Sequence, residues 1–316
     1  MTDTHANTPD EKNVEGVNAH ITEPEDAGAS LWSDAWRIMR SRPLFWVSAG
    51  LIAIFVLMAV VPQLFTNADP AFCDLSLARL PPDGTAWFGY DLQGCDVYSR
   101  TIYGARSSIL VGVLTMMATV IIGGTLGIIA GFTGGWVDAL LSRIADVFFA
   151  IPLLLGGIII MYTFRSPPGA PYSLIVGKVV FALAILYWPN IFRLMRSSVL
   201  QVKPNEYVLA ARALGASPAR IILSHVLPNA VAPVIVVATI DLGAFITTEA
   251  ALSFLGIGLQ PPAISWGIAI SEASGLGYIA AAPHMLLFPS LFLSLAVLGF
   301  IMLGEVVRDA MDPKLR

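Results

Sequence analysis

Charged side chains are scarce in this 316-residue chain: Asp, Glu, Lys and Arg make up 13% of it, and apolar residues make up 56%. A soluble domain carries about 25% charged residues, so one or two soluble domains of this length are excluded. The apolar content also excludes an intrinsically disordered chain. With 18 basic and 22 acidic residues, a nucleic-acid-binding protein is excluded as well. The composition indicates an integral membrane protein.

Motifs of catalytic and cofactor sites are missing from the sequence. No G-x-x-x-x-G-K-[ST] phosphate loop, H-E-x-x-H zinc motif or G-x-S-x-G nucleophile elbow occurs, and the four histidines are scattered. We therefore expect no enzyme activity, no cofactor and no metal on this chain. If transport is driven by ATP, the ATPase must be another polypeptide.

Six stretches with few or no charges are long enough to cross a bilayer, which takes about 20 mostly apolar residues for ~30 Å of hydrocarbon. The expected fold is therefore all-α, a polytopic membrane protein with six transmembrane helices. The predicted spans are Pro43–Ala68, Ser107–Val137, Val147–Phe164, Tyr172–Phe192, Ala230–Leu252 and His284–Gly304.

Basic residues predict the orientation, because cytoplasmic flanks carry an excess of Lys and Arg. With the N-terminus inside, 13 basic residues fall in the inner segments and five in the outer ones, so both termini are predicted to be cytoplasmic. Residues 1–30 are predicted to be an acidic, disordered cytoplasmic tail. Residues 31–42 mix tryptophans and arginines and predict a helix in contact with membrane lipid, the alternative being an ordinary aromatic flank. Residues 43–316 would form the transmembrane domain.

The two cysteines, Cys73 and Cys95, both fall in the predicted outer loop, residues 67–106. Two thiols lack the companion ligands of a zinc site. Disulfides form and persist outside the membrane, so a disulfide is favoured over two free thiols.

Two carboxylates, Asp241 and Glu249, lie within the predicted fifth span. Eight residues along a helix correspond to a rotation of about 80°, so the two side chains share a broad face. Intramembrane carboxylates are costly and usually face a cavity or a partner. Lining a transport pathway and bracing the bundle are both open interpretations.

Glycines recur at intervals of four in the predicted second span, at Gly123, Gly127 and Gly131. This spacing predicts a groove along one helix face, where the backbone of another helix can approach closely.

The longest predicted cytoplasmic connection covers residues 193–229. Helix-forming residues run from Glu206 to Leu214, and Gly215 suits a left-handed helix end. Ser217 and Pro218 suit the cap and first position of a following helix. The segment predicts two short helices joined at Gly215, as a docking element for a partner.

This segment resembles the signature loop of ABC-importer permeases, E-A-A, three residues, G, nine residues, I-x-L-P. The sequence departs from that pattern at Leu209, which stands where the family has Glu, and at His225, which stands where it has Ile. The coupling residues that the resemblance implies are Glu206, Ala210, Ala211, Arg212, Gly215, Leu227 and Pro228.

Residues 88–109 and 249–267 are similar to motifs of the C-type subunit in the dipeptide/oligopeptide/nickel permease subfamily. The resemblance implies a type I ABC importer in a bacterial plasma membrane. This chain would pair with a second permease, two ATPase domains or subunits that bind ATP and Mg, and an external substrate-binding protein that delivers peptide. The loop helix would be the coupling helix.

Two other classes of function stay open. An ion-coupled secondary transporter would use Asp241 and Glu249 and need no ATPase, although the sequence shows no convincing inverted repeat. A scaffold or receptor-like membrane protein would transport nothing. Copurification with an ATPase separates the ABC permease from both alternatives.

Overall fold

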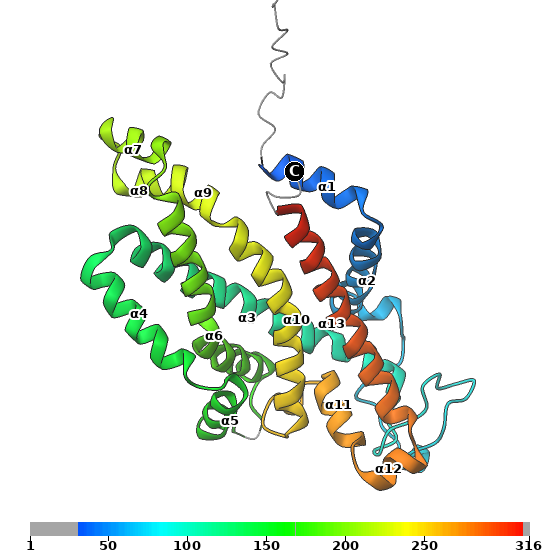
Figure 1. Ribbon diagram of the computed structural model, residues 1–316. Helices are drawn as coiled ribbons and strands as arrows, with labels where there is room; N and C mark the ends of the chain where they lie inside the picture. The colour runs from blue at the N-terminus through cyan, green and yellow to red at the C-terminus, as the bar shows by residue number, and fades with distance from the viewer. Residues whose placement is uncertain (1–30, 168, 312–316) are drawn as a thin grey trace, which may run out of the picture.

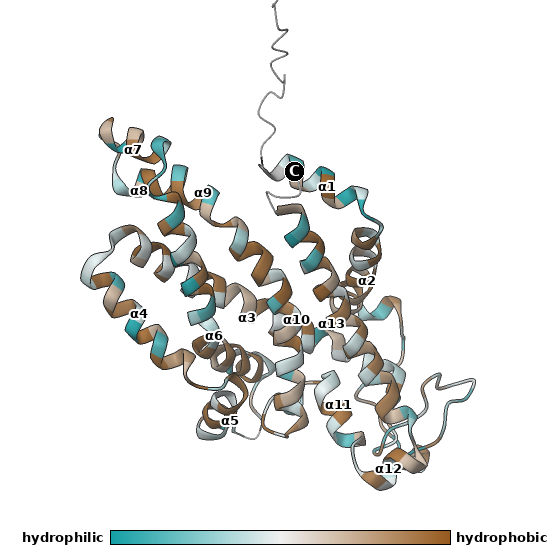
Figure 2. Cartoon of the chain, in the orientation of Figure 1, coloured by the Kyte–Doolittle hydropathy of each residue, from teal (hydrophilic) through white to brown (hydrophobic). Residues whose placement is uncertain are grey.

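The computed structural model describes residues 31–167 and 169–311, so the predicted acidic tail lies outside the described residues. Within that part of the chain, five helices are long and apolar enough to cross a membrane. These helices are α2 (Pro43–Val60), α3 (Val97–Thr133), α6 (Tyr172–Val202), α10 (Ala232–Phe254) and α13 (His284–Met311). They pack into one bundle, in which α3 crosses behind α6 and α10 in Figure 1, and Figure 2 shows that most of their residues are hydrophobic.

The predicted third span, Val147–Phe164, is interrupted by a bend in the structure. The structure divides this region between α4 (Gly135–Phe149) and α5 (Leu153–Thr163), which meet at 84°. Pro152 lacks a backbone N–H and disfavours helical conformation in the residue before it, so the helix stops there. The pair counts as a sixth span only if both arms are taken together.

Helices extend beyond the charge-free stretches at several ends. α3 begins at Val97 rather than Ser107, so residues 97–106 of the predicted outer loop are helical. Asp96 caps this end by accepting a hydrogen bond from the N–H of Tyr98 at 2.8 Å. Arg106, which the charge criterion placed outside the span, donates from Nε to the carbonyl of Ala59 at 3.2 Å.

Short helices gather at the two ends of the bundle (Figure 1). α1 (Leu31–Ser41), α7 (Glu206–Ala213), α8 (Pro218–Ile221) and the last turn of α13 lie at one end, and α11 (Trp266–Ala273) and α12 (Leu276–Ala281) lie at the other. The remaining pieces are two 3₁₀ turns (Pro62–Leu64 and Leu75–Leu77), a π turn (Ile222–Val226) and α9 (Leu227–Ala230). Arg42, just after α1, forms an ion pair with Asp309 of α13.

The glycine row of α3 packs directly on α6. A Cβ added at Gly123 would lie 2.5 Å from the carbonyl oxygen of Trp188, and one at Gly127 would lie 2.7 Å from that of Phe192. At Gly131 the nearest atom would be Cβ of Val199, at 2.9 Å. The partner in the predicted groove is therefore the backbone of α6.

Candidate functional site: a helix pair at one end and buried carboxylates in the bundle

The segment between α6 and α10 contains the two short helices that the sequence predicts. α7 ends at Ala213, and Gly215 follows with φ of +81°, a conformation that side-chain-bearing residues rarely adopt. Ser217 then caps α8, its Oγ accepting from the N–H of Arg220 at 3.4 Å. The π turn and α9 connect α8 to α10, so the helix pair is bracketed by two membrane-spanning helices.

One face of this helix pair is buried against the bundle. Val208 of α7 and Ile221 of α8 are buried and join a cluster that includes Val202 of α6 and Val234 of α10. Ala211 is half-buried and packs against the same cluster. The pair therefore has a fixed place on the ends of α6 and α10.

The opposite face is exposed and partly apolar. Leu214 is 88% exposed, and Leu209 and Tyr207 are about half exposed. Of the residues implied by the resemblance, Ala211 and Leu227 are half-buried. The others are exposed: Glu206, Ala210, Arg212, Gly215 and Pro228. Leu209, which replaces the family glutamate, lies on this exposed face.

Ion pairs hold the end of α6 that carries the helix pair. Arg196 pairs with Asp138 of α4, and Arg193 pairs with Asp146 of α4 at 2.8 Å. Lys203 donates to the carbonyl of Phe132 at the end of α3, at 2.7 Å. The prediction from sequence missed Asp138 and Asp146 because it counted the arginines only for orientation. Two acids close in sequence to a predicted span were the available signal.

Asp241 lies at the interface of α6 and α10. Its side chain is 8% exposed, and Oδ1 accepts a hydrogen bond from the hydroxyl of Tyr187 at 2.7 Å. Oδ2 is buried without a hydrogen-bond partner. The ring of Tyr187 packs edge-on against Phe245.

Glu249 occupies a different environment and is fully buried. Its Oε1 accepts from the hydroxyl of Ser253 at 2.7 Å, and its Oε2 has no hydrogen-bond partner. The two carboxylates therefore contact different neighbours: Asp241 faces α6, and Glu249 is enclosed by hydroxyl groups.

The opposite end of the bundle carries the disulfide predicted from the two cysteines. Cys73 and Cys95 are bonded, with an S–S distance of 2.01 Å, so the prediction is confirmed. Arg100, at the start of α3, donates to Asp91 of this loop at 2.5 Å and lies 3.6 Å from Glu272 of α11. The pKa of Glu272 is raised, mainly because the carboxyl is partly removed from water. The positive charge of Arg100 lowers this pKa, and the negative charge of Asp91 raises it further.

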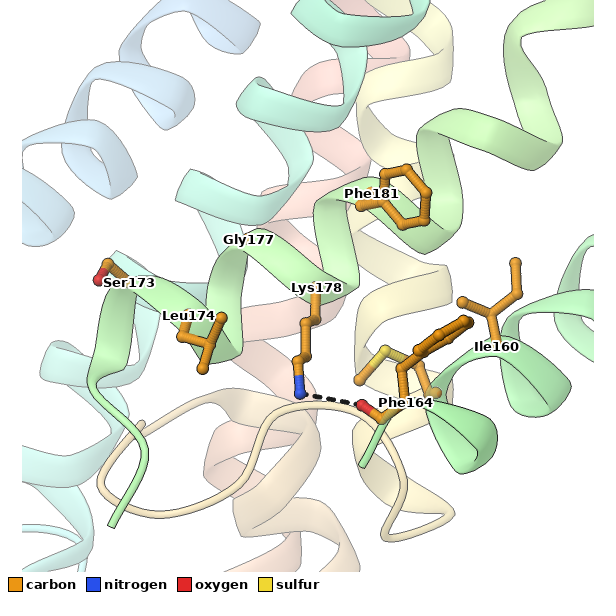
Figure 3. Close-up of a pocket in the computed structure, with 8 residues that line it drawn as sticks. Ile160, Phe164, Ser173, Leu174, Gly177, Lys178 and Phe181 are labelled. Carbon is orange, nitrogen blue, oxygen red and sulfur yellow. Dashed lines mark hydrogen bonds between the residues drawn. The ribbon is translucent and has the colours of Figure 1, made fainter. Parts of the chain in front are cut away.

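An apolar groove of about 480 Å³ lies between α5 and α6 (Figure 3). Lys178 lies along it, and its ammonium group donates to the carbonyls of Phe164 at 2.9 Å and Arg165 at 3.1 Å. The lysine thereby satisfies carbonyls at the end of α5. Since its donors are used in this way, the groove offers no converging polar groups for a small ligand.

Comparisons with known proteins identify the family of this chain. Residues 123–316 match the family described as binding-protein-dependent transport system inner membrane component, and residues 30–82 match the N-terminal TM domain of oligopeptide transport permease C. The oligopeptide transport system permease protein OppC of Bacillus subtilis is 39% identical over 287 residues, 91% of each chain. The dipeptide transport system permease protein DppC of Alkalihalophilus pseudofirmus is 39% identical over 93% of this chain and 94% of its own.

Among solved structures, the inward-facing MetNI methionine ABC transporter matches with a TM-score of 0.52 and 20% sequence identity, over 67% of this chain and 96% of that chain. At that identity the match shows the fold alone, a type I ABC-importer transmembrane domain. Taken with the family match and the curated relatives, it means that this chain belongs to the binding-protein-dependent transport family, as a C-type permease of the oligopeptide and dipeptide branch of ABC importers.

Proposed function

We propose that this chain forms one half of the translocation pathway of a peptide importer, with a second permease subunit as the other half. Two ATPase domains or subunits bind ATP and Mg, and an external binding protein delivers the peptide. The peptide cargo is supported by the relatives named as oligopeptide and dipeptide permeases. The chain itself carries no catalytic step, and its place is the bacterial plasma membrane.

The observation that carries this proposal is the exposed face of the α7–α8 pair. Leu214, at the tip of a helix whose other face is buried against the bundle, is 88% exposed and adds almost nothing to packing within this chain. It suits an apolar cleft on a partner, and an ATPase domain is the partner that an ABC permease requires at this place. ATP-driven approach of the two ATPases would then pull on α6 and α10 through α7 and α8, shifting the bundle between its two access states.

The same reasoning orients the chain. α1, the α7–α8 pair and the last turn of α13 lie at one end of the bundle, and the disulfide-bonded loop lies at the other (Figure 1). ATPase domains work in the cytoplasm, and disulfides persist outside it. Both termini are then cytoplasmic, and the loop around Cys73 and Cys95 faces the binding protein.

A matched pair of surface substitutions tests the proposal in the complete transporter. Leu214 and Leu276 are both 88% exposed, one on each end of the bundle. In mild-detergent pull-downs, Leu214→Glu should lower the copurified ATPase about tenfold or more, because an unpaired charge in an apolar cleft is strongly unfavourable. Leu276→Glu should leave the amount of copurified ATPase unchanged.

The proposal fails if the chain purifies without a second permease or ATPase chains, or if Leu214→Glu copurifies as much ATPase as the unsubstituted chain. Uptake that continues in vesicles without ATP, driven by an ion gradient, would favour the secondary-transporter alternative and return attention to Asp241 and Glu249.

A further inference from the structure

The fully buried carboxyl of Glu249 is surrounded by serine hydroxyls. Ser253, one turn further along α10, donates to Oε1 at 2.7 Å. The side chains of Ser108 on α3 and Ser265 at the start of α11 also lie beside the carboxyl. Three elements of the fold therefore meet at this one acidic group.

No positive charge compensates this carboxyl. Among the described residues, none of the ion pairs includes Glu249, and none of the groups acting on it is a lysine, arginine or histidine. An isolated carboxylate removed from water is so unfavourable that the group takes up a proton instead. The cost is greater in a helix that crosses a membrane, where water is distant.

Two buried oxygen atoms in this cluster have no hydrogen-bond partner: Oε2 of Glu249 and Oγ of Ser108. An ionised carboxylate can only accept hydrogen bonds. A proton on Oε2 removes this buried negative charge, which no neighbouring cation offsets. Oε1 remains the acceptor that Ser253 already uses.

The serine hydroxyls of this cluster are partly occupied by backbone N–H donors. The hydroxyl of Ser253 accepts from the N–H of Leu259 at 3.0 Å, and that of Ser265 accepts from the N–H of Ile268 at 3.2 Å, so their lone pairs are partly used. A Cβ added at Gly267 would lie 2.6 Å from the carbonyl oxygen of Ala250, which shows how closely α11 approaches α10.

We infer that Glu249 permanently holds a proton, and that its neutral carboxyl accepts from Ser253 and packs beside Ser108 and Ser265. Without a charge at this position, α3, α10 and the start of α11 can pack around one buried group. Glu249 is thus a positioning residue, and its proton is a structural component rather than a transported or coupling ion. The inference does not depend on the cargo.

Glutamine is the natural test, because it keeps the acceptor oxygen and replaces the O–H donor by an uncharged N–H donor. In the complete transporter, Glu249→Gln should keep the uptake rate within about twofold, and Glu249→Leu should lower it roughly tenfold or more by leaving the buried serines unpaired. Glu305→Gln, at a half-exposed position on α13, is the matched control and should behave like the unsubstituted chain.

Infrared spectra of the complex labelled with ¹³C-glutamate report the proton directly and do not depend on transport. The carbonyl band of a protonated carboxyl should be present across neutral pH, should disappear in Glu249→Gln and should persist in Glu305→Gln. The inference is overturned if that band is absent, or if Glu249→Gln loses uptake while Glu305→Gln does not. If Glu249→Leu fails to assemble, uptake by Glu249→Gln and the infrared spectra still test whether Glu249 holds a proton.

Discussion

Tyr187 of α6 donates a 2.7 Å hydrogen bond to Oδ1 of Asp241 on α10, and so links the two helices that carry the α7–α8 pair at their ends. The bond lies among apolar side chains, next to the ring of Phe245. The bond therefore links α6 and α10 within the bundle, and the segment from α7 to α9 links the same two helices at the end of the bundle.

Tyr187→Phe should destabilise the complex by about 1–3 kcal/mol, because it leaves a second oxygen of the buried Asp241 without a partner. Thermal unfolding of the purified complex measures this loss. Tyr162→Phe is the control, since that ring is 62% exposed, and it should unfold at the original temperature. Equal unfolding temperatures for both variants would show that the bond contributes nothing.

Gly127→Ala should destabilise the contact between α3 and α6 by about 1–3 kcal/mol, because its Cβ would lie 2.7 Å from a backbone oxygen that has no freedom to move away. Gly177→Ala, in α6, meets no atom within 4 Å and should be neutral or stabilising by up to about 1 kcal/mol. Thermal unfolding of the two variants side by side checks the prediction. An equal fall in unfolding temperature for both variants would show that the effect does not come from close packing at Gly127.

Gly215→Pro should abolish uptake while the chain still inserts into the membrane. Proline requires φ near −65°, whereas Gly215 has +81°, and the substitution also removes the N–H that donates to the carbonyl of Arg212 at 3.0 Å. Gly215→Ala, with open space around its Cβ, should cost only about 1 kcal/mol of backbone strain and keep partial uptake. Vesicle uptake with ATP measures both, and normal uptake by the proline variant would rule out a fixed helix pair.

Cys73 and Cys95 should resist alkylation in intact, unreduced cells and should both react after reduction and unfolding. Mass spectrometry of the alkylated chain counts the modified thiols. Cys73→Ser should destabilise the outer loop by about 3 kcal/mol, because the disulfide joins residues that are 22 positions apart and so restricts the unfolded chain. Modification of either thiol before reduction would contradict the bond.

Glu272→Gln should change the pH dependence of stability. Burial raises the pKa of Glu272, so the folded state binds its proton more tightly than the unfolded state, and this contribution is lost as pH rises through the raised pKa. Glutamine keeps the neutral form at every pH, so the variant should be more stable than the parent at neutral pH. The advantage should vanish below the ordinary glutamate pKa of about 4.3. Unfolding temperatures between about pH 4 and pH 8 test the sign.

The sequence predicted the existence of the spans better than their ends. Helix α10 matches the predicted span Ala230–Leu252 within two residues at each end, but α3 starts ten residues early because Arg100 and Arg106 find partners in other segments. Such pairings bring together residues far apart in the chain, and local composition carries no information about them. The bend at Pro152, in contrast, has a local cause, a proline inside the predicted span Val147–Phe164.

The helix pair was predictable for the same local reason: Gly215 and the Ser217–Pro218 step specify a turn and a new helix start. The disulfide was predictable because both cysteines fall in a loop assigned to the outside of the membrane, where disulfides persist. The partners of the two intramembrane carboxylates were beyond reach, because Tyr187 and Ser108 lie on helices far away in the sequence. Their spacing on α10 suggested one shared face, whereas packing gives each a separate set of neighbours.

The glycine row of α3 also has a mechanical consequence. Since the backbones of α3 and α6 touch at Gly123 and Gly127, sliding one helix along the other would drive side chains of α6 into backbone atoms. The two helices are therefore expected to behave as one stiff beam, about 46 Å long for the 31 residues of α6. We then expect a displacement of the α7–α8 pair to move α3 and α6 together, and bending to occur elsewhere, such as between α4 and α5.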